Sequence, residues 1–380
     1  MSADAPRPEP DAVEGAPHPR ETRVLHGQAA AERGFLDAFA GGRLHHAWLL
    51  TGPRGVGKAT LAWRIARFLL TQPLPGDAAG LFGTAPPAPD SLDTPGDHPV
   101  ARRVAQLAEP QLFLLRRGWD DKAKPPRLKT VITVDEVRRL KSFFALSSAD
   151  GGRRVVIVDA ADEMNVNAAN ALLKLLEEPP ENAVLLLVSH QPSRLLPTIR
   201  SRCRELRLGT LGPGEMAAAL DAAGAETGAD PAALAELSGG SVGEAIRLTN
   251  LDGLETYAKL VALFARSPGM DRAAALALAE SCAGREAETR FDLMLRLTGL
   301  LLHRLARTGA SGPQAAEAAP GEADVLARLA PDRAAALRWA GLADTALGRA
   351  RHGKAVNLDP AALILDMFLR IDETAARHAA

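Results

Sequence analysis

A glycine-rich stretch directly after a short apolar run constrains this chain more than any other feature of its sequence. The apolar run is Ala47–Thr51, and residues 52–59 read Gly-Pro-Arg-Gly-Val-Gly-Lys-Ala before a helical pattern begins. Glycines let a backbone curl so that its N–H groups face a phosphate, and the following helix N-terminus adds partial positive charge. The strand–loop–helix order therefore predicts a phosphate-binding loop, with an incidental glycine-rich turn as the alternative. The predicted binding residues are Gly52, Gly55, Gly57 and Lys58, whose ammonium would reach the β and γ phosphate oxygens.

This loop lacks one group that ATP hydrolysis requires. The eighth position of such a loop is a serine or threonine whose hydroxyl ligates Mg²⁺, and here it is Ala59. Thr60 follows, but one residue along a helix rotates a side chain by ~100°, away from the ion. We therefore expect phosphate binding to survive and metal-assisted hydrolysis to suffer.

A second apolar run ends in an acid. Val155–Val158 leads into Asp159, which matches the pattern whose aspartate organises Mg²⁺ in nucleotide hydrolases. A hydrolase of this kind carries a glutamate next, which polarises the attacking water, and this chain has Ala160. Alternatively, Asp159 is a strand-end residue that caps the next turn. The paired loss at Ala59 and Ala160 predicts a degenerate nucleotide site, in which the backbone cradle persists without the chemistry.

Apolar runs alternate with helical patterns over the first half of the chain. The runs Ala47–Thr51, Leu112–Leu115, Val155–Val158 and Ala183–Val188 are apolar at consecutive positions, as parallel strands covered on both faces are. Helical spacing lies between them, which indicates an α/β core with a parallel sheet between helices. After about Leu208 the strand pattern disappears and the remaining patterns are helical.

These patterns divide the 380 residues into four regions. Residues 1–22 are rich in proline, alanine and charge, which predicts a disordered tail. Residues 23–209 form the predicted α/β core, with a surface insertion over 72–126 that is rich in proline, glycine and aspartate. We expect a small helical lid over 210–252 and a separate all-helical domain over 253–380.

Composition excludes several classes of protein. With 45 basic and 46 acidic side chains the formal charge is −1, which argues against a generally basic DNA-coating protein. Cys203 and Cys282 are too few for a four-cysteine zinc site or a secreted disulfide framework. The N-terminus lacks the apolar core of a signal peptide, and no apolar run is long enough to cross a membrane. We expect a protein of the reducing cytoplasm.

Three segments together resemble one family. Residues 165–180 read NVNAANALLKLLEEPP, residues 189–203 read SHQPSRLLPTIRSRC, and residues 44–48 read LHHAW before the phosphate loop. These segments closely resemble the AAA+ clamp-loader family of bacterial DNA polymerase III, and within it the delta-prime relatives. The resemblance covers most of residues 23–250 at the level of motifs, whereas the C-terminal helical region matches only in length and character.

The resemblance implies a role in trans for one arginine. Ser201, Arg202 and Cys203 match the family's SRC motif, whose arginine projects into the ATP site of the neighbouring subunit. Arg202 would stabilise charge on the γ-phosphate as an arginine finger, and such fingers are worth ~10³–10⁵ in rate in related enzymes. The alternative is that Arg202 makes a structural ion pair within its own chain.

Two further positions follow from the same resemblance. Ser189 stands where AAA+ proteins place a polar sensor residue, although a serine at a strand end is commonplace. Residues 240–243 resemble the lid motif that carries a nucleotide-sensing arginine, but Gly243 stands in the place of that arginine. The absence of the arginine is a third departure from a working ATPase.

Basic side chains and metal ligands complete the candidate sites. Arg138, Arg139 and Lys141 share one helical pattern in the area where related loaders face primer–template phosphates, and a solvated basic face is the alternative. His45 and His46 are expected to pack or to cap rather than to bind a ligand. Many delta-prime proteins carry a four-cysteine zinc module after the loop helix, but the equivalent region here has no cysteine. We therefore predict no zinc or other metal.

The resemblance implies a non-hydrolysing scaffold that supplies an arginine finger during loading of the sliding clamp in DNA replication. Its partners would be the gamma/tau ATPase and the delta subunit of a hetero-pentamer, with the C-terminal helices in a common collar, and indirectly the clamp and primed DNA. It would be a subunit of a DNA-directed DNA polymerase (nucleotidyltransferase) holoenzyme without independent catalysis, able at most to bind ATP or ADP.

Two other interpretations stay open. The first is a self-sufficient AAA+ ATPase, either gamma/tau-like or a helicase-type motor. Lys58 and Asp159 favour it, whereas Ala59, Ala160 and Gly243 oppose it. The second is a P-loop phosphotransferase acting on a small molecule, for which the sequence offers no acceptor-site motif.

Overall fold

The computed structural model describes residue 7 and residues 9–74, 89–145, 152–225, 230–283, 287–314 and 316–379. The chain divides into two compact units. The first consists of Met1–Leu211, Ala218–Ala225 and Ser241–Gly243, and the second of Gly212–Ala217, Glu226–Gly240 and Glu244–Ala380. Within the described residues, none of the helices combines the length and the apolar character needed to cross a membrane.

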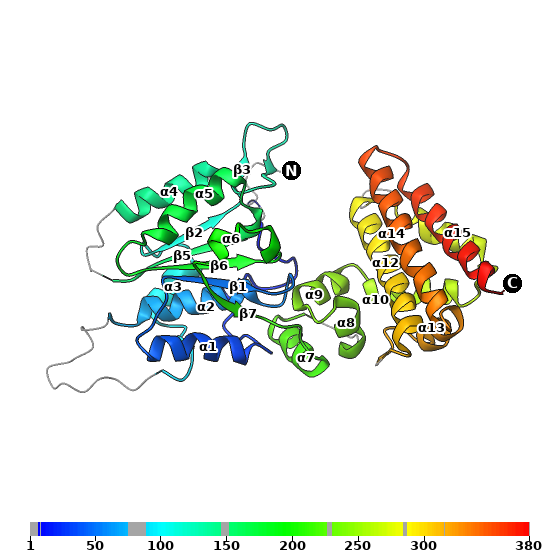
Figure 1. The fold of residues 1–380 in the computed structure, drawn as a ribbon, viewed down its shortest axis with the longest axis horizontal. Coiled ribbons are helices and arrows are strands. Elements are labelled where there is room, and N and C mark those ends of the chain that lie inside the picture. Colours follow the sequence, from blue (N-terminus) through cyan, green and yellow to red (C-terminus); the bar gives the residue numbers. More distant parts are fainter. Residues whose placement is uncertain are drawn as a thin grey trace. The chain divides into compact units, whose positions relative to one another are not determined.

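A five-stranded parallel sheet forms the centre of the first unit (Figure 1). Its strands lie in the order β2 (Leu112–Arg116), β5 (Arg154–Asp159), β6 (Ala183–Ser189), β1 (Ala47–Thr51) and β7 (Arg204–Arg207). All neighbouring strands are parallel, so their carboxyl ends meet at one edge of the sheet. The three central strands are buried along almost their whole length, which explains their consecutive apolar residues. The predicted fold class and all four predicted strands are confirmed.

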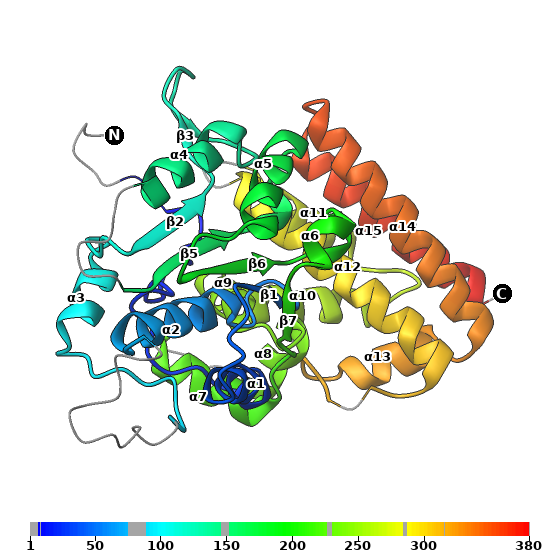
Figure 2. The same cartoon turned by 60° about the vertical axis from the view of Figure 1, so that its left-hand side comes forward.

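Helices cover both faces of this sheet, as Figures 1 and 2 both show. One face carries α1 (Ala29–Ala40), α2 (Lys58–Thr71) and α3 (Pro99–Ala105); the other carries α4 (Val134–Ala145), α5 (Val166–Glu177) and α6 (Pro197–Arg200). A separate apolar cluster fills each layer. Trp48, Trp63 and Phe68 are buried in the first cluster, and Leu140 and Leu172 in the second.

The fifth strand, β7, was not predicted from the sequence. Only Leu206 is buried in it, while Arg204, Glu205 and Arg207 are exposed. β7 lies at the edge of the sheet and pairs only with β1 among the described strands. Edge strands often carry charged side chains, and this composition hides the strand from an apolar pattern.

The expected surface insertion over residues 72–126 is wrong for part of its length. β2 pairs with β5 in the central sheet, and Leu92 and Val104 are buried in the cluster that contains Trp63. Single apolar residues spread among prolines and glycines gave no periodic signal, although they join the core. The same segment contains a short antiparallel pair, β3 (Trp119–Asp120) and β4 (Arg127–Leu128). Residues 75–88 lie outside the described part of the chain.

The expected disordered tail over residues 1–22 is wrong for residues 9–22, which pack on the first unit. Arg67 of α2 donates to the carbonyl oxygens of Arg20 at 2.6 Å and Thr22 at 2.8 Å. The segment has few apolar residues, so its composition suggested disorder. Polar contacts with arginines of the core hold it in place instead.

Helices and connecting loops make up the described residues after β7. Three short helices come first: α7 (Pro213–Ala222), α8 (Pro231–Ser238) and α9 (Val242–Asn250). Six more follow: α10 (Gly253–Phe264), α11 (Arg272–Glu280), α12 (Ala287–Ser311), α13 (Glu322–Leu329), α14 (Arg333–Ala355) and α15 (Pro360–Ala379). The long helices α12 and α14 pack together, and α15 packs on α14 and α11.

A buried ionic cluster joins helices of the second unit. Glu322 is completely buried, and its carboxylate accepts hydrogen bonds from the Tyr257 hydroxyl at 2.5 Å, Arg304 Nε at 2.6 Å and the Ala318 amide at 2.6 Å. Arg304 also donates to Glu236 of α8 at 2.7 Å. This cluster ties α8, which the sequence placed in a lid, to the helices of the expected C-terminal domain within one unit.

Candidate nucleotide site and arginine-bearing edge

The phosphate loop lies at the carboxyl end of β1, where the sequence predicts it. Gly55 and Gly57 have φ angles of 79° and 101°, in a region that glycine adopts far more readily than other residues. A Cβ atom at Gly55 would lie 2.3 Å from Ser241 Oγ. The loop conformation therefore depends on these glycines, and α2 begins directly after them at Lys58.

The Lys58 ammonium is directed into the loop itself. Its Nζ donates to the carbonyl oxygens of Gly52 at 2.7 Å and Pro53 at 2.5 Å. Burial lowers the pKa of Lys58 to about 8, against the opposing effect of Asp159 and Asp162. A bound phosphate would have to replace the two carbonyl oxygens as the partner of this ammonium.

Asp159 ends β5 beside the loop, as expected. Its carboxyl is buried, and burial together with the negative charge of Asp11 and Glu163 raises its pKa to about 7. Lys58 and Arg116 act in the opposite direction. The side chain is thus poised between its neutral and charged forms near neutral pH.

The two acids that follow Asp159 are both engaged elsewhere. Asp162 accepts hydrogen bonds from the backbone amides of His190 at 2.9 Å and Gln191 at 3.2 Å. Glu163 forms an ion pair with Arg117 at 2.7 Å. Neither carboxylate is free to replace the glutamate that a hydrolase carries at the position of Ala160.

The lid motif closes against the phosphate loop. The Gly243 amide donates to the Gly55 carbonyl oxygen at 3.0 Å, and Ser241 Oγ donates to the Arg54 carbonyl oxygen at 2.8 Å. A Cβ atom at Gly243 would lie only 3.2 Å from Gly55 Cα. The position where related proteins carry a sensing arginine is therefore a close contact between two backbones.

The candidate sensor Ser189 lies at the same edge. It is the last residue of β6, it aligns with Thr51 at the end of β1, and it is fully buried. Over the residues that the structure describes, its hydroxyl has no hydrogen-bond partner.

The N-terminal segment contributes to this edge, which sequence reasoning missed. Asp11 pairs with Arg116 at 2.5 Å, and Arg116 aligns with Asp159 in the register of β2 and β5. Val13 reaches the lid motif: its Cγ2 lies 3.8 Å from the position that a Cβ atom on Gly243 would take. No local pattern in residues 1–22 indicates this placement, because the partners are far away in the sequence.

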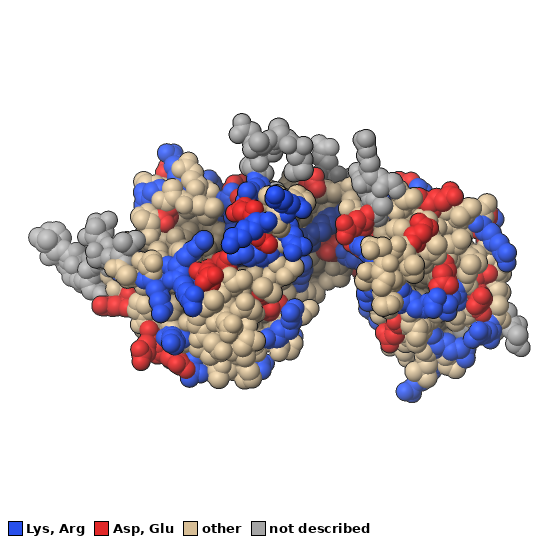
Figure 3. Space-filling model, turned by 90° about the horizontal axis from the view of Figure 1, so that it is seen from above, with Lys and Arg blue, Asp and Glu red and all other residues tan. Residues whose placement is uncertain are grey.

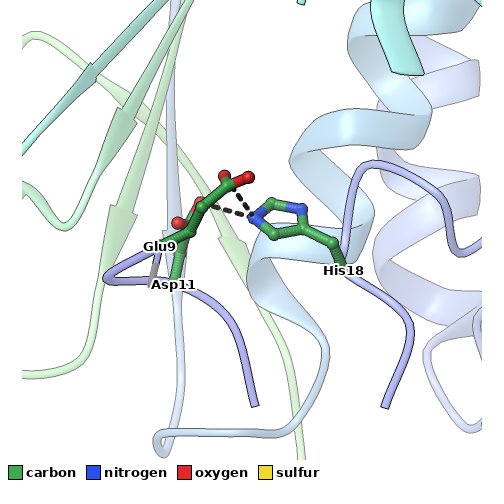
Figure 4. Close-up of side chains that lie close together, drawn as sticks. All are labelled: Glu9, Asp11 and His18. Carbon is green, nitrogen blue, oxygen red and sulfur yellow. Dashed lines mark ion pairs between the residues drawn. The ribbon is translucent and has the colours of Figure 1, made fainter. Parts of the chain in front are cut away.

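Glu9, Asp11 and His18 of this segment form a charge cluster (Figure 4). His18 Nε2 lies 3.2 Å from Glu9 Oε2 and 3.3 Å from Asp11 Oδ2. His18 Nδ1 accepts the backbone N–H of Arg20 at 3.1 Å, so in a neutral ring Nε2 carries the proton. Glu9 also accepts hydrogen bonds from the guanidinium groups of Arg20 and Arg116. A metal ion would have to displace that proton and both guanidinium groups, so we interpret the cluster as a charge clamp.

Arg202 follows α6 and is half-exposed. Its guanidinium forms an ion pair with Glu177 at 2.8 Å through one terminal nitrogen and donates to the Thr198 carbonyl oxygen at 3.1 Å through the other. Ser201 Oγ donates to the same carbonyl oxygen at 3.2 Å. Burial raises the pKa of the Cys203 thiol to about 12, so this residue is a neutral packing group.

The remaining candidate residues lie away from the loop. Arg138, Arg139 and Lys141 are exposed on α4. His46 Nε2 contacts the Leu176 carbonyl oxygen at the end of α5 at 3.0 Å, and its ring stacks on that of His45, as expected of packing and capping residues. On the face drawn in Figure 3, basic and acidic side chains lie side by side in both units, in keeping with the formal charge of −1.

Together these features define a class of protein: a domain with the AAA+ P-loop fold, in which three residues of a working nucleotide hydrolase are replaced. The phosphate loop, its lysine and the strand-end aspartate are present. Ala59, Ala160 and Gly243 stand where a hydrolase carries a metal-binding hydroxyl, a glutamate and a sensing arginine.

Comparison with known proteins assigns the family. The family model described as DNA polymerase III, delta subunit matches residues 27–212. DNA polymerase III subunit delta-prime of Pseudomonas aeruginosa is 43% identical over 165 residues, which cover 43% of each chain. The Escherichia coli (strain K12) protein of the same name is 30% identical over 342 residues, which cover 89% of this chain and 92% of that one. The chain belongs to the DNA polymerase III delta-prime family.

The extent of similarity differs between relatives. The match spans less than half of the Pseudomonas protein but most of the E. coli protein. Among solved structures, a DNA polymerase III gamma subunit-related protein from Thermotoga maritima aligns with 90% of this chain and 99% of that one, with a TM-score of 0.43 and 17% sequence identity.

Proposed function

We propose that this chain is a non-hydrolysing clamp-loader subunit that supplies Arg202 in trans to the ATP site of a neighbouring subunit. The observation that carries the proposal is a half-exposed arginine of an SRC motif on a domain whose own nucleotide site lacks three catalytic groups. The partners would be the gamma/tau ATPase and the delta subunit in a hetero-pentamer, which together load a sliding clamp onto primed DNA.

The absence of hydrolysis is supported by how the neighbouring side chains are engaged. Ala59 and Ala160 have no polar side-chain atoms. Asp162 is bound by backbone amides and Glu163 by Arg117, so neither acid can orient a water on a phosphate. Loss of a residue that positions the nucleophile removes much of the acceleration in phosphoryl transfer, because the reaction depends on positioning and on charge stabilisation.

Nucleotide binding without hydrolysis is the cofactor chemistry that the residues permit. Lys58 and the glycine-rich backbone would hold the phosphates, and Asp159 would face an associated cation once ionised. The closed contact between Gly243 and Gly55 opposes such binding, because it brings the lid motif onto the loop. We propose ATP or ADP as the only candidate cofactors, and no zinc.

Arg202 has the properties that an arginine finger needs. A guanidinium keeps its charge at all physiological pH values, and its planar fork matches two phosphate oxygens. The side chain is 36% exposed, so a neighbouring subunit can reach it.

Arg138, Arg139 and Lys141 provide an exposed basic face on α4, which we propose as a contact for DNA phosphates.

The test is Arg202→Ala in a loader reconstituted with the ATPase and delta subunits of the same organism. Clamp- and DNA-stimulated ATP hydrolysis should fall to the rate that the other ATPase sites sustain, because a finger contributes ~10³–10⁵ only at the one site that it completes. Arg200→Ala is the matched control, since Arg200 is exposed at the end of α6. An unchanged rate in a fully assembled Arg202→Ala complex would show that the finger assignment is wrong.

A further inference from the structure

We propose that Glu177 is a latch for Arg202: it holds the guanidinium on its own chain until a phosphate of the neighbouring subunit competes for it. This inference rests on the function proposed above and adds regulation to it. The observation behind it is an ion pair of 2.8 Å between Arg202 and Glu177. This pair joins the end of α5 to the segment that follows α6.

Both terminal nitrogens of Arg202 are engaged within the chain. One pairs with Glu177 Oε1 at 2.8 Å, and the other donates to the Thr198 carbonyl oxygen at 3.1 Å. An arginine binds phosphate most strongly through two parallel N–H groups. A guanidinium has five N–H groups, and the contacts with Glu177 and Thr198 fix its orientation, so a phosphate must compete with them to align two of these groups on its oxygens.

The position of Glu177 explains why its carboxylate is available as a partner. Glu177 is the last residue of α5, where the helix dipole disfavours a negative charge, and Pro179 and Pro180 follow. Pairing with a guanidinium offsets this unfavourable placement. Leu172 and Leu176 are buried beneath the helix, so the end of α5 is fixed relative to the sheet.

Exposure makes the latch weak enough to release. The side chains of Arg202 and Glu177 are 36% and 48% exposed, and ion pairs of this kind contribute little to stability. A phosphate carries more negative charge than a carboxylate and offers a geometry that matches the guanidinium fork. The γ-phosphate of a neighbour can therefore displace Glu177, whereas in its absence the pair forms again.

The adjacent residue provides a matched control. Glu178 is also exposed and caps the same helix, but within the described part of the chain it forms no ion pair. Replacing either glutamate by glutamine removes one negative charge from the same helix end and keeps the size of the side chain. Only Glu177→Gln removes the partner of Arg202.

The experiment compares Glu177→Gln, Glu178→Gln, Arg202→Ala and the double variant Glu177→Gln/Arg202→Ala in the reconstituted loader. At ATP concentrations below KM, Glu177→Gln should raise ATP hydrolysis by about two- to fivefold, the range that corresponds to one exposed ion pair. Glu178→Gln should match the wild type, and the double variant should match Arg202→Ala. The gain should shrink as salt is added, because screening already weakens the wild-type pair.

The outcomes separate the latch from the function on which it rests. If Arg202→Ala lowers hydrolysis but Glu177→Gln leaves it unchanged or lowers it, the latch is overturned and the finger stands. A gain that persists in the double variant also overturns the latch, because it then does not act through Arg202. If Arg202→Ala itself has no effect on an assembled complex, the proposed function fails.

Discussion

Asp159 and Lys58 show how burial tunes two single residues at the edge of the sheet. Burial raises the pKa of Asp159 to about 7 and lowers that of Lys58 to about 8, so both groups move toward their neutral forms. In a working nucleotide site, the phosphates and the metal ion would favour the charged forms of both groups. Here the carbonyl oxygens of the loop are the partners of Lys58, and the neighbours of Asp159 include two other acids.

Asp159→Asn should therefore stabilise the chain more at pH 8 than at pH 5. Between the ordinary aspartate pKa of 3.8 and the raised pKa of about 7, the folded state keeps a proton that the unfolded state has lost. The contribution of this group to the free energy of unfolding is therefore present at low pH. It falls as pH rises, by at most about 1.4 kcal/mol per pH unit. Urea denaturation of both proteins at the two pH values measures the effect. An equal difference at pH 5 and pH 8 would contradict the shift.

Glu322 is the residue on which the second unit depends most clearly. Glu322→Gln leaves Arg304 without its fully buried partner and weakens the acceptor of the Tyr257 hydroxyl. Because the buried Arg304 then keeps only the partly exposed Glu236 as a charged partner, we expect a loss of about 3 kcal/mol in the free energy of unfolding. Chemical denaturation of the variant measures it, with the exposed Glu280→Gln as a control that should change little. Equal stability of the two variants would refute the role of the cluster.

At the scale of elements, the N-terminal segment is the main difference from what the sequence predicts. Hydrogen bonds from Arg20 and Arg116 lower the pKa of Glu9 although burial opposes them, and His18 and Arg116 do the same for Asp11. The cluster of Glu9, Asp11 and His18 therefore contributes its full stability above the ordinary pKa values of these acids. Its contribution is lost as pH falls through their lowered pKa values. Tail composition alone cannot reveal such partners.

Arg116→Gln should loosen this segment without unfolding the sheet. It removes the guanidinium that joins Glu9 and Asp11 to the end of β2. Hydrogen exchange of the amides at residues 21 and 22, which both bond to the His18 carbonyl oxygen, should become faster in the variant. Arg33→Gln, at an exposed position of α1, is the control. Unchanged exchange in Arg116→Gln would mean that other contacts hold the segment.

Which elements the sequence predicts depends on how they are buried. The strands β1, β5 and β6 are covered on both faces, so their apolar runs are unmistakable, and α5 follows from its leucine spacing and the prolines after it. β7 was missed because it is a polar edge strand. The strand β2 follows from its apolar run, but the insertion expected over residues 72–126 includes it, because prolines and glycines are frequent in that stretch.

At the scale of the whole molecule, the sequence predicts the class of fold and the composition of the nucleotide site. The strand–loop–helix order and the substitutions Ala59, Ala160 and Gly243 can be read locally. Contacts between distant segments cannot: the Arg202–Glu177 pair, the Gly243–Gly55 contact and the buried Glu322 cluster each join residues without a shared pattern. These contacts determine which polar groups can still bind a ligand or a partner.

We propose that the nucleotide site is retained in shape and silent in chemistry, so that the chain contributes to catalysis in trans. The most direct test is ATP hydrolysis by the isolated chain, with clamp and primed DNA added, beside Lys58→Ala. We expect no turnover above background in either sample. If the isolated chain hydrolyses ATP and Lys58→Ala abolishes this activity, the proposal of a silent site is contradicted and the chain is a self-sufficient ATPase.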